Sequence, residues 1–167
     1  MIDNELLLNA KKEVEDTFNY LIESVREVTR EYTSTLDGIV AELDKGINLF
    51  SNAELWDFQV RLGIEAYRLG NIKEQSELKE SCAEALYKEG MAKTLLGTTG
   101  AVEVKKQQSI INNIDKQALN MLYSAVASLL KTKCDEAHRL VNILQGIQMS
   151  RAAEAKLYAS PRNEQEN

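Results

Sequence analysis

The chain has 167 residues, of which 44% are hydrophobic and 28% charged, and its formal net charge is −6. This composition is too apolar for a disordered chain, and the length suffices for one domain with a hydrophobic core. The acidic balance excludes the densely basic surface that a nucleic-acid partner usually requires. A single proline, 6% aromatic residues and short β-branched runs favour helices over a sheet.

The compartment is predicted from the cysteines and from the absence of targeting patterns. Cys82 and Cys134 lie far apart and form no disulfide framework, which favours reduced thiols in a cytoplasmic protein. No basic segment precedes an apolar core near the N-terminus, and no apolar run approaches the roughly 20 residues that cross a bilayer. We therefore expect no membrane partner.

The first predicted helix covers residues 3–48, with Asp3 or Asn4 as its N-terminal cap. Its apolar residues alternate in steps of four and three, which is the rhythm of a coiled-coil seam. Thr33, Thr35 and Gly38 weaken the pattern and predict a bend. We interpret the following residues as the seam of a homo-oligomer: Val14, Phe18, Leu21, Val25, Val28, Tyr32 and Ile39.

A capping box at Ser51 to Glu54 predicts the start of a second helix, covering residues 52–69. Gly70 is typical of the residue that ends a helix, and Asn71 is expected to begin a third helix that ends near Leu96. The short link predicts an antiparallel helical hairpin over residues 52–96. The inner side of the third helix is expected to contain Leu78, Cys82, Ala85, Leu86, Ala92 and Leu96.

The second predicted helix carries two apolar faces at about 100° per residue. The first contains Leu55, Phe58, Leu62, Ala66 and Leu69, and the second contains Trp56, Val60, Ile64 and Tyr67. One face is enough to pack on a neighbouring helix. The second either packs against the long helices or binds a partner, and Trp and Tyr are residue types in which binding energy concentrates. The alternative of a partner surface at Trp56, Val60, Ile64 and Tyr67 stays open at this point.

The last predicted helix covers residues 102–158, and a polar tail follows at residues 161–167. Its apolar stripe starts with Ile111, Ile114, Ala118, Met121 and Ala125, and then shifts to Leu130, Cys134, Ala137, Val141 and Leu144. Residues 1–50 contain 5 basic and 11 acidic side chains, whereas residues 101–167 contain 9 and 7. The first and last helices are therefore expected to lie side by side.

No catalytic or metal-binding pattern stands out. His138 is the only histidine, and it shares a predicted helix face with Cys134 and Asp135. One histidine cannot supply the pair of Glu-x-x-His motifs of a di-iron bundle, and a zinc site here lacks a fourth protein ligand. We expect no catalytic residue, metal or cofactor.

The sequence thus predicts an all-α protein: an elongated helical bundle in which two long helices flank a helical hairpin with coiled-coil-like packing. Residues 1–160 are expected to form a single helical domain. The predicted function is that of a non-enzymatic protein-interaction or assembly subunit that forms homo-oligomers and possibly binds one other protein. The alternative is a small regulatory inhibitor or adaptor that binds one target protein.

Overall fold

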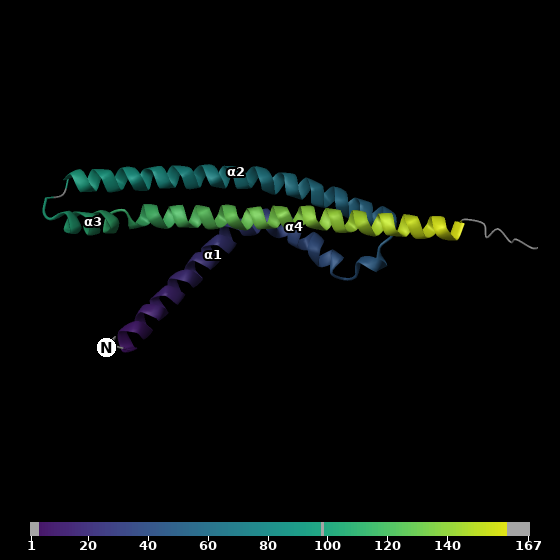
Figure 1. The fold of residues 1–167 in the computed structure, drawn as a ribbon, viewed down its shortest axis with the longest axis horizontal. Coiled ribbons are helices and arrows are strands. Elements are labelled where there is room, and N and C mark those ends of the chain that lie inside the picture. Colours follow the sequence, from purple (N-terminus) through teal and green to yellow (C-terminus); the bar gives the residue numbers. More distant parts are fainter. Residues whose placement is uncertain (1–3, 98, 160–167) are drawn as a thin grey trace, which may run out of the picture. The chain divides into compact units, whose positions relative to one another are not determined.

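The computed structural model of the chain describes residues 4–97 and 99–159, except for some side chains near the two ends. Within these residues the protein contains four α-helices and one short 3₁₀-helix and no strand, which confirms the all-α prediction. The helices are α1 (Asn4–Leu43), α2 (Asn52–Gly97), α3 (Val102–Ile111) and α4 (Ile114–Ala159), with η1 (Ile47–Leu49) between α1 and α2. Figure 1 shows α2 and α4 side by side, running in opposite directions.

Backbone contacts divide the chain into two compact units. The first unit comprises Met1–Thr33 and Gly70–Lys131, and the second comprises Ser34–Leu69 and Thr132–Asn167. Helices α1, α2 and α4 contribute segments to both units. The single domain over residues 1–160 stays a prediction, and the polar tail lies outside the described residues.

The second unit has a core of aliphatic side chains from three helices. α1 contributes Leu36, Ile39 and Leu43, all of which are buried. α2 contributes the face that starts at Leu55, and α4 contributes Ala137 and Leu144. One cross-helix ion pair joins the acidic first helix to the last, because Lys133 Nζ lies 2.8 Å from an oxygen of Asp37.

The first helix ends earlier than predicted. The sequence predicts a helix to residue 48, but α1 ends at Leu43 and is followed by a turn in which Gly46 has φ of 127°. A residue with a Cβ atom is strained at this positive φ, which explains why the turn uses a glycine. The turn then leads through η1 to the start of α2.

The capping box at the start of α2 is confirmed. The Ser51 backbone N–H donates to the Glu54 carboxylate at 2.7 Å, and the Glu54 N–H donates to the Ser51 hydroxyl at 3.3 Å. Hydrogen bonding from the Ser51 hydroxyl, and then from its backbone N–H, lowers the pKa of Glu54. Beside this cap, the rings of Phe50 and Phe58 meet edge to face with centroids 5.0 Å apart.

The predicted hairpin is wrong, because α2 continues through Gly70 and Asn71 to Gly97. Gly70 does not have the positive φ that ends a helix, since the only described glycines with positive φ are Gly46 and Gly100. The seven-residue stripe of Leu55, Leu62 and Leu69 therefore runs on into Ser76, Ala83 and Gly90, which are all buried. The side chains expected on the inner side, Leu78, Cys82, Ala85, Leu86, Ala92 and Leu96, are exposed instead.

The last predicted helix is interrupted. Asn112 and Asn113 separate α3 from α4, and Asn113 is buried with its amide nitrogen donating to the Ser109 carbonyl at 2.9 Å. An asparagine side chain that bonds nearby backbone competes with continuous helix. The first part of the predicted stripe is wrong, because Ile111, Ile114, Ala118 and Met121 are exposed. The second part is confirmed at its three buried members, Leu130, Ala137 and Leu144.

Asn113 also packs against Gly90, and this contact explains the glycine. A Cβ atom at Gly90 would overlap the side-chain oxygen of Asn113 and lie 2.8 Å from its Cγ atom. The Asn113 amide further donates to the Thr94 hydroxyl at 3.3 Å. The junction of α3 and α4 is thus held against α2 by a polar side chain that occupies the space of a missing one.

We predict that Gly90→Ala lowers the free energy of unfolding by about 1–3 kcal/mol through overpacking, although alanine is the better helix former. Urea denaturation measures this loss. The variant Asn113→Ala removes the overlapping atoms, so adding Gly90→Ala to it should have little effect or be stabilising. Equal losses from Gly90→Ala in both backgrounds would contradict the packing argument.

We also predict a pH-dependent contribution from the capping box, tested with Glu54→Ala. A carboxyl group whose pKa is lowered by folding stabilises the protein above its unfolded-state pKa, and this contribution is lost as the pH falls through the folded-state pKa. The stability gap between wild type and Glu54→Ala should therefore be largest near neutral pH and shrink in acid. Urea denaturation over a pH series measures the gap, and a gap that grows in acid would refute the assignment.

Candidate interaction surface

The segment of α2 within the second unit separates its two apolar faces completely. On the first face the leucines 55, 62 and 69 have no exposed area, and the remaining members are also buried. Burying a leucine side chain contributes about 1.5–3 kcal/mol relative to exposure. This face therefore orients the helix in its unit. Its members are Leu55, Phe58, Leu62, Ala66 and Leu69.

The second face is open to solvent. Trp56 is 63% exposed, Val60 39%, Ile64 60% and Tyr67 75%. We call these four side chains the Trp56 face. The alternative that they pack against the long helices of the same chain is thereby excluded for this structure. Large apolar side chains scattered singly over a surface are ordinary, but four on one helix face form a contiguous apolar patch.

The helix that carries the Trp56 face is held on both flanks. On one flank, the Arg61 guanidinium lies 3.3 Å from Glu42 of α1. On the other, the side-chain amide of Gln59 donates to Gln148 of α4 at 2.9 Å, and Gln148 donates to a backbone carbonyl at the start of α2. These bonds fix the rotation of α2 in the second unit, so the Trp56 face is a rigid surface rather than a mobile one.

The predicted seam of α1 is divided between core and surface. Val25 and Ile39 are buried, Leu21 and Tyr32 are half-buried, and Phe18 and Val28 are exposed. The side chain of Val14 lies outside those that the structure describes. Thr29 and Leu36, each one position after a predicted seam residue, are buried. The self-association of this seam stays a prediction, carried on the exposed side by Phe18 and Val28.

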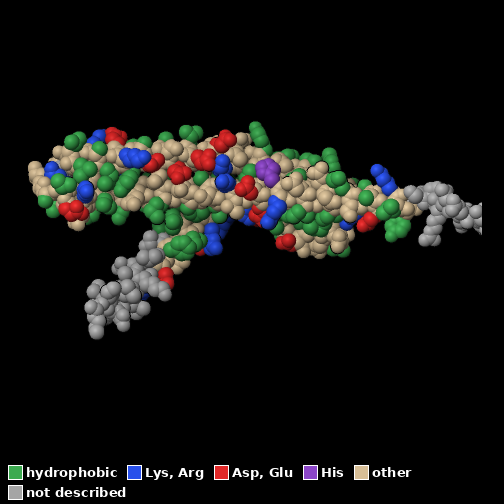
Figure 2. All heavy atoms as spheres, viewed as in Figure 1, with side chains coloured by type: hydrophobic (Ala, Val, Ile, Leu, Met, Phe, Trp, Pro, Cys, Tyr) green, Lys and Arg blue, Asp and Glu red, His purple; other side chains and the backbone are tan. Residues whose placement is uncertain are grey.

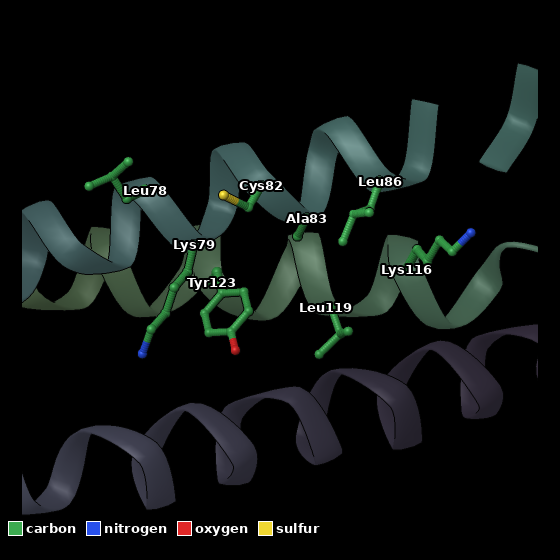
Figure 3. Close-up of a pocket in the computed structure, with 8 residues that line it drawn as sticks. All are labelled: Leu78, Lys79, Cys82, Ala83, Leu86, Lys116, Leu119 and Tyr123. Carbon is green, nitrogen blue, oxygen red and sulfur yellow. The ribbon is translucent and has the colours of Figure 1, made fainter. Parts of the chain in front are cut away.

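A shallow apolar groove lies in the first unit between α2 and α4, with a volume of about 380 Å³ (Figure 3). Two lysines border it, and Lys79 Nζ lies 5.8 Å from the centroid of the Tyr123 ring. None of the lining side chains is a carboxylate or an imidazole, so the groove lacks an acid–base pair. It is lined by Leu78, Lys79, Cys82, Ala83, Leu86, Lys116, Leu119 and Tyr123.

The cysteines and the histidine do not assemble into a reactive centre among the described residues. Cys134 Sγ lies 3.8 Å from His138 Nδ1 and donates to the carbonyl of Ala66 at 3.4 Å. The single histidine lies at the surface (Figure 2). In residues 4–97 and 99–159, no group of three or more His, Cys, Asp and Glu side chains is placed to hold a metal ion.

Charged side chains are mixed rather than gathered. Figure 2 shows acidic and basic side chains interspersed over the visible face. Lys133 bonds Asp37 and Glu136, and these bonds raise its pKa although burial opposes the charged form. Nor does any helix of the described part contain a stretch that is both apolar enough and long enough to traverse a bilayer.

Sequence reasoning missed the exposed side chains along the second half of α2, such as Leu78 and Leu86. The signal that finds them is the seven-residue spacing from Leu69 to Ser76 and Ala83, which continues the buried stripe through small and polar residues. Apolar content alone assigns the wrong side of the helix, because small side chains also allow close helix packing.

Comparison with known proteins adds no relative. No protein-family model matches the chain, and neither the curated proteins nor the solved structures include a similar one. The functional argument therefore depends on the surfaces described above.

We predict that replacing Trp56 and Tyr67 together by alanine changes thermal stability little, because both side chains are exposed. The matched control is Leu62→Ala on the buried face, which should cost about 2–5 kcal/mol. Thermal and urea denaturation at low protein concentration compare the two variants. A loss of stability in the double variant that equals that of Leu62→Ala would show that the Trp56 face is core.

Proposed function

We propose that the chain is a non-enzymatic assembly subunit, which acts by packing its helices against another polypeptide and first of all against copies of itself. The observation that carries the proposal is the Trp56 face. An apolar helix face with a tryptophan and a tyrosine is held rigidly at the surface, while the opposite face supplies the core.

The residue types on this face support a binding role. Tryptophan and tyrosine are enriched among the side chains that dominate interface energies, because they bury a large area and lose few rotamers on binding. The rigid flanks reduce the entropic cost of association, since the surface is already ordered before a partner arrives. A preformed apolar helix face of this kind favours helix-to-helix recognition.

The α1 seam adds a second surface to the proposal. Phe18 and Val28 are exposed, and Tyr20 beside them is 77% exposed. An apolar groove of about 460 Å³ lies next to this part of α1, between α1 and α4 within the first unit, and Leu21 and Met121 are among its lining residues. We include this side of α1 in the self-association that the coiled-coil rhythm predicts.

The proposal assigns no catalysis to the chain and places it in the cytoplasm. The grooves lack acid–base pairs with a nucleophile, and the Cys134 thiol is bonded to a backbone carbonyl. Both cysteines are free, which is usual where thiols are kept reduced.

We predict that the protein self-associates in the micromolar range, and that Trp56 reports it. The chain contains a single tryptophan, so its emission should shift to shorter wavelength as the concentration rises and the indole leaves water. Light scattering coupled to gel filtration measures the mass over the same range. A mass of one chain with unchanged emission throughout would overturn the proposed function.

A further inference from the structure

Gly63 has no structural reason within the described chain. It lies inside α2 without a positive φ, and a Cβ atom built on it would meet nothing within 4 Å. Glycine in a helix interior costs about 1 kcal/mol relative to alanine. Gly90 of the same helix differs, because the side chain of Asn113 occupies the space of its missing Cβ atom. The fold therefore needs a glycine at position 90 and does not need one at position 63.

Gly63 belongs to the same stripe as the Trp56 face. Positions 56, 60, 63 and 67 follow steps of four, three and four, which is the spacing of a coiled-coil seam. All four positions are exposed. The seam thus presents three large apolar side chains and one gap, and a gap of this kind lets a second helix approach closely or receives one of its side chains.

We propose that the occupant of this seam is the α2 helix of a second copy, packed antiparallel about a two-fold axis that passes between Arg61 and Leu62. This inference rests on the proposed function and specifies its partner and geometry. In an antiparallel seam, each first-type position faces a second-type position of the other helix. Val60 of one copy then faces Gly63 of the other, and Trp56 faces Tyr67.

The arrangement is self-complementary in shape. The two-fold axis repeats each contact, so that two valines enter two glycine gaps at the centre and two Trp–Tyr pairs close the ends. Aromatic pairs stabilise an interface beyond the area that they bury. A parallel pair in register would instead place Gly63 against Gly63 and Trp56 against Trp56, which leaves the gap empty.

The charges beside the seam favour the same direction. Asp57 and Arg68 lie on one flank of the Trp56 face, and an antiparallel pair brings Asp57 of one copy to the level of Arg68 of the other. In a parallel pair this charged flank would face the uncharged flank of Asn52 and Gln59. Within one chain Asp57 lies 3.8 Å from Arg61 and Arg68 lies 2.6 Å from Glu65, so the flank already alternates in charge.

The first experiment replaces the glycine in the full chain. Gly63→Ala fills the gap, and we expect it to weaken self-association roughly tenfold while raising the thermal stability at low concentration. The matched control is Gly146→Ala on α4, where a Cβ atom also meets nothing within 4 Å. Sedimentation equilibrium measures association, and unchanged association in Gly63→Ala would overturn the inference.

The second experiment determines direction by disulfide formation in variants that lack Cys82 and Cys134. Trp56→Cys and Tyr67→Cys are made separately, and positions 56 and 67 lie about 16 Å apart along the helix. Antiparallel packing predicts a crosslink only when the two variants are mixed, because a disulfide requires closely spaced Cα atoms. Crosslinks formed by each variant alone would indicate parallel packing.

The outcomes separate the inference from the proposed function. If wild type associates and both glycine variants associate equally, another surface is used, and the inference fails while the proposed function survives. Crosslinking of each variant alone has the same meaning, since association remains and its direction is wrong. A wild-type chain that stays monomeric and binds no second copy at any concentration contradicts both.

Discussion

The burial of one leucine stripe on α2 determines how the second unit presents itself. Leu55, Leu62 and Leu69 recur every seven residues, and none retains exposed area. Once these side chains are inside, the helix cannot rotate without exposing several kcal/mol of apolar burial. The rotation that buries them necessarily turns the residues about 100–180° away toward solvent, and these include Trp56, Ile64 and Tyr67. The core and the proposed interface are thus two results of one packing choice.

Local signals in the sequence predicted local structure well. The capping box at Ser51 and Glu54 was recognisable because both partners of its reciprocal hydrogen bonds are close in the chain. Gly70 misled because the same residue type that ends helices is also tolerated inside them, at a cost that tertiary packing offsets. The interruption at Asn113 depends on its bond to Thr94, which no local pattern reveals.

The candidate surface was predictable as a face but not as an exposed one. The periodicity of residues 52–69 separates two apolar faces, yet the number of helices that surround them decides which face meets water. In the second unit, segments of α1 and α4 hold the flanks through Glu42 and Gln148, and the Trp56 face receives no neighbour. On α1 the predicted seam departed from the buried one by a single position, since Thr29 and not Val28 is buried.

The change of composition along the buried stripe of α2 has a consequence for local opening of the backbone. After Leu69 the stripe continues as Ser76, Ala83 and Gly90, and on the facing helix the side-chain oxygen of Asn120 is buried without a hydrogen-bond partner. Fewer apolar atoms resist separation in residues 70–97 than in residues 52–69, although the helix is continuous. Amide hydrogens of one helix should therefore exchange at two distinct rates, with the slower set beneath the exposed aromatic residues.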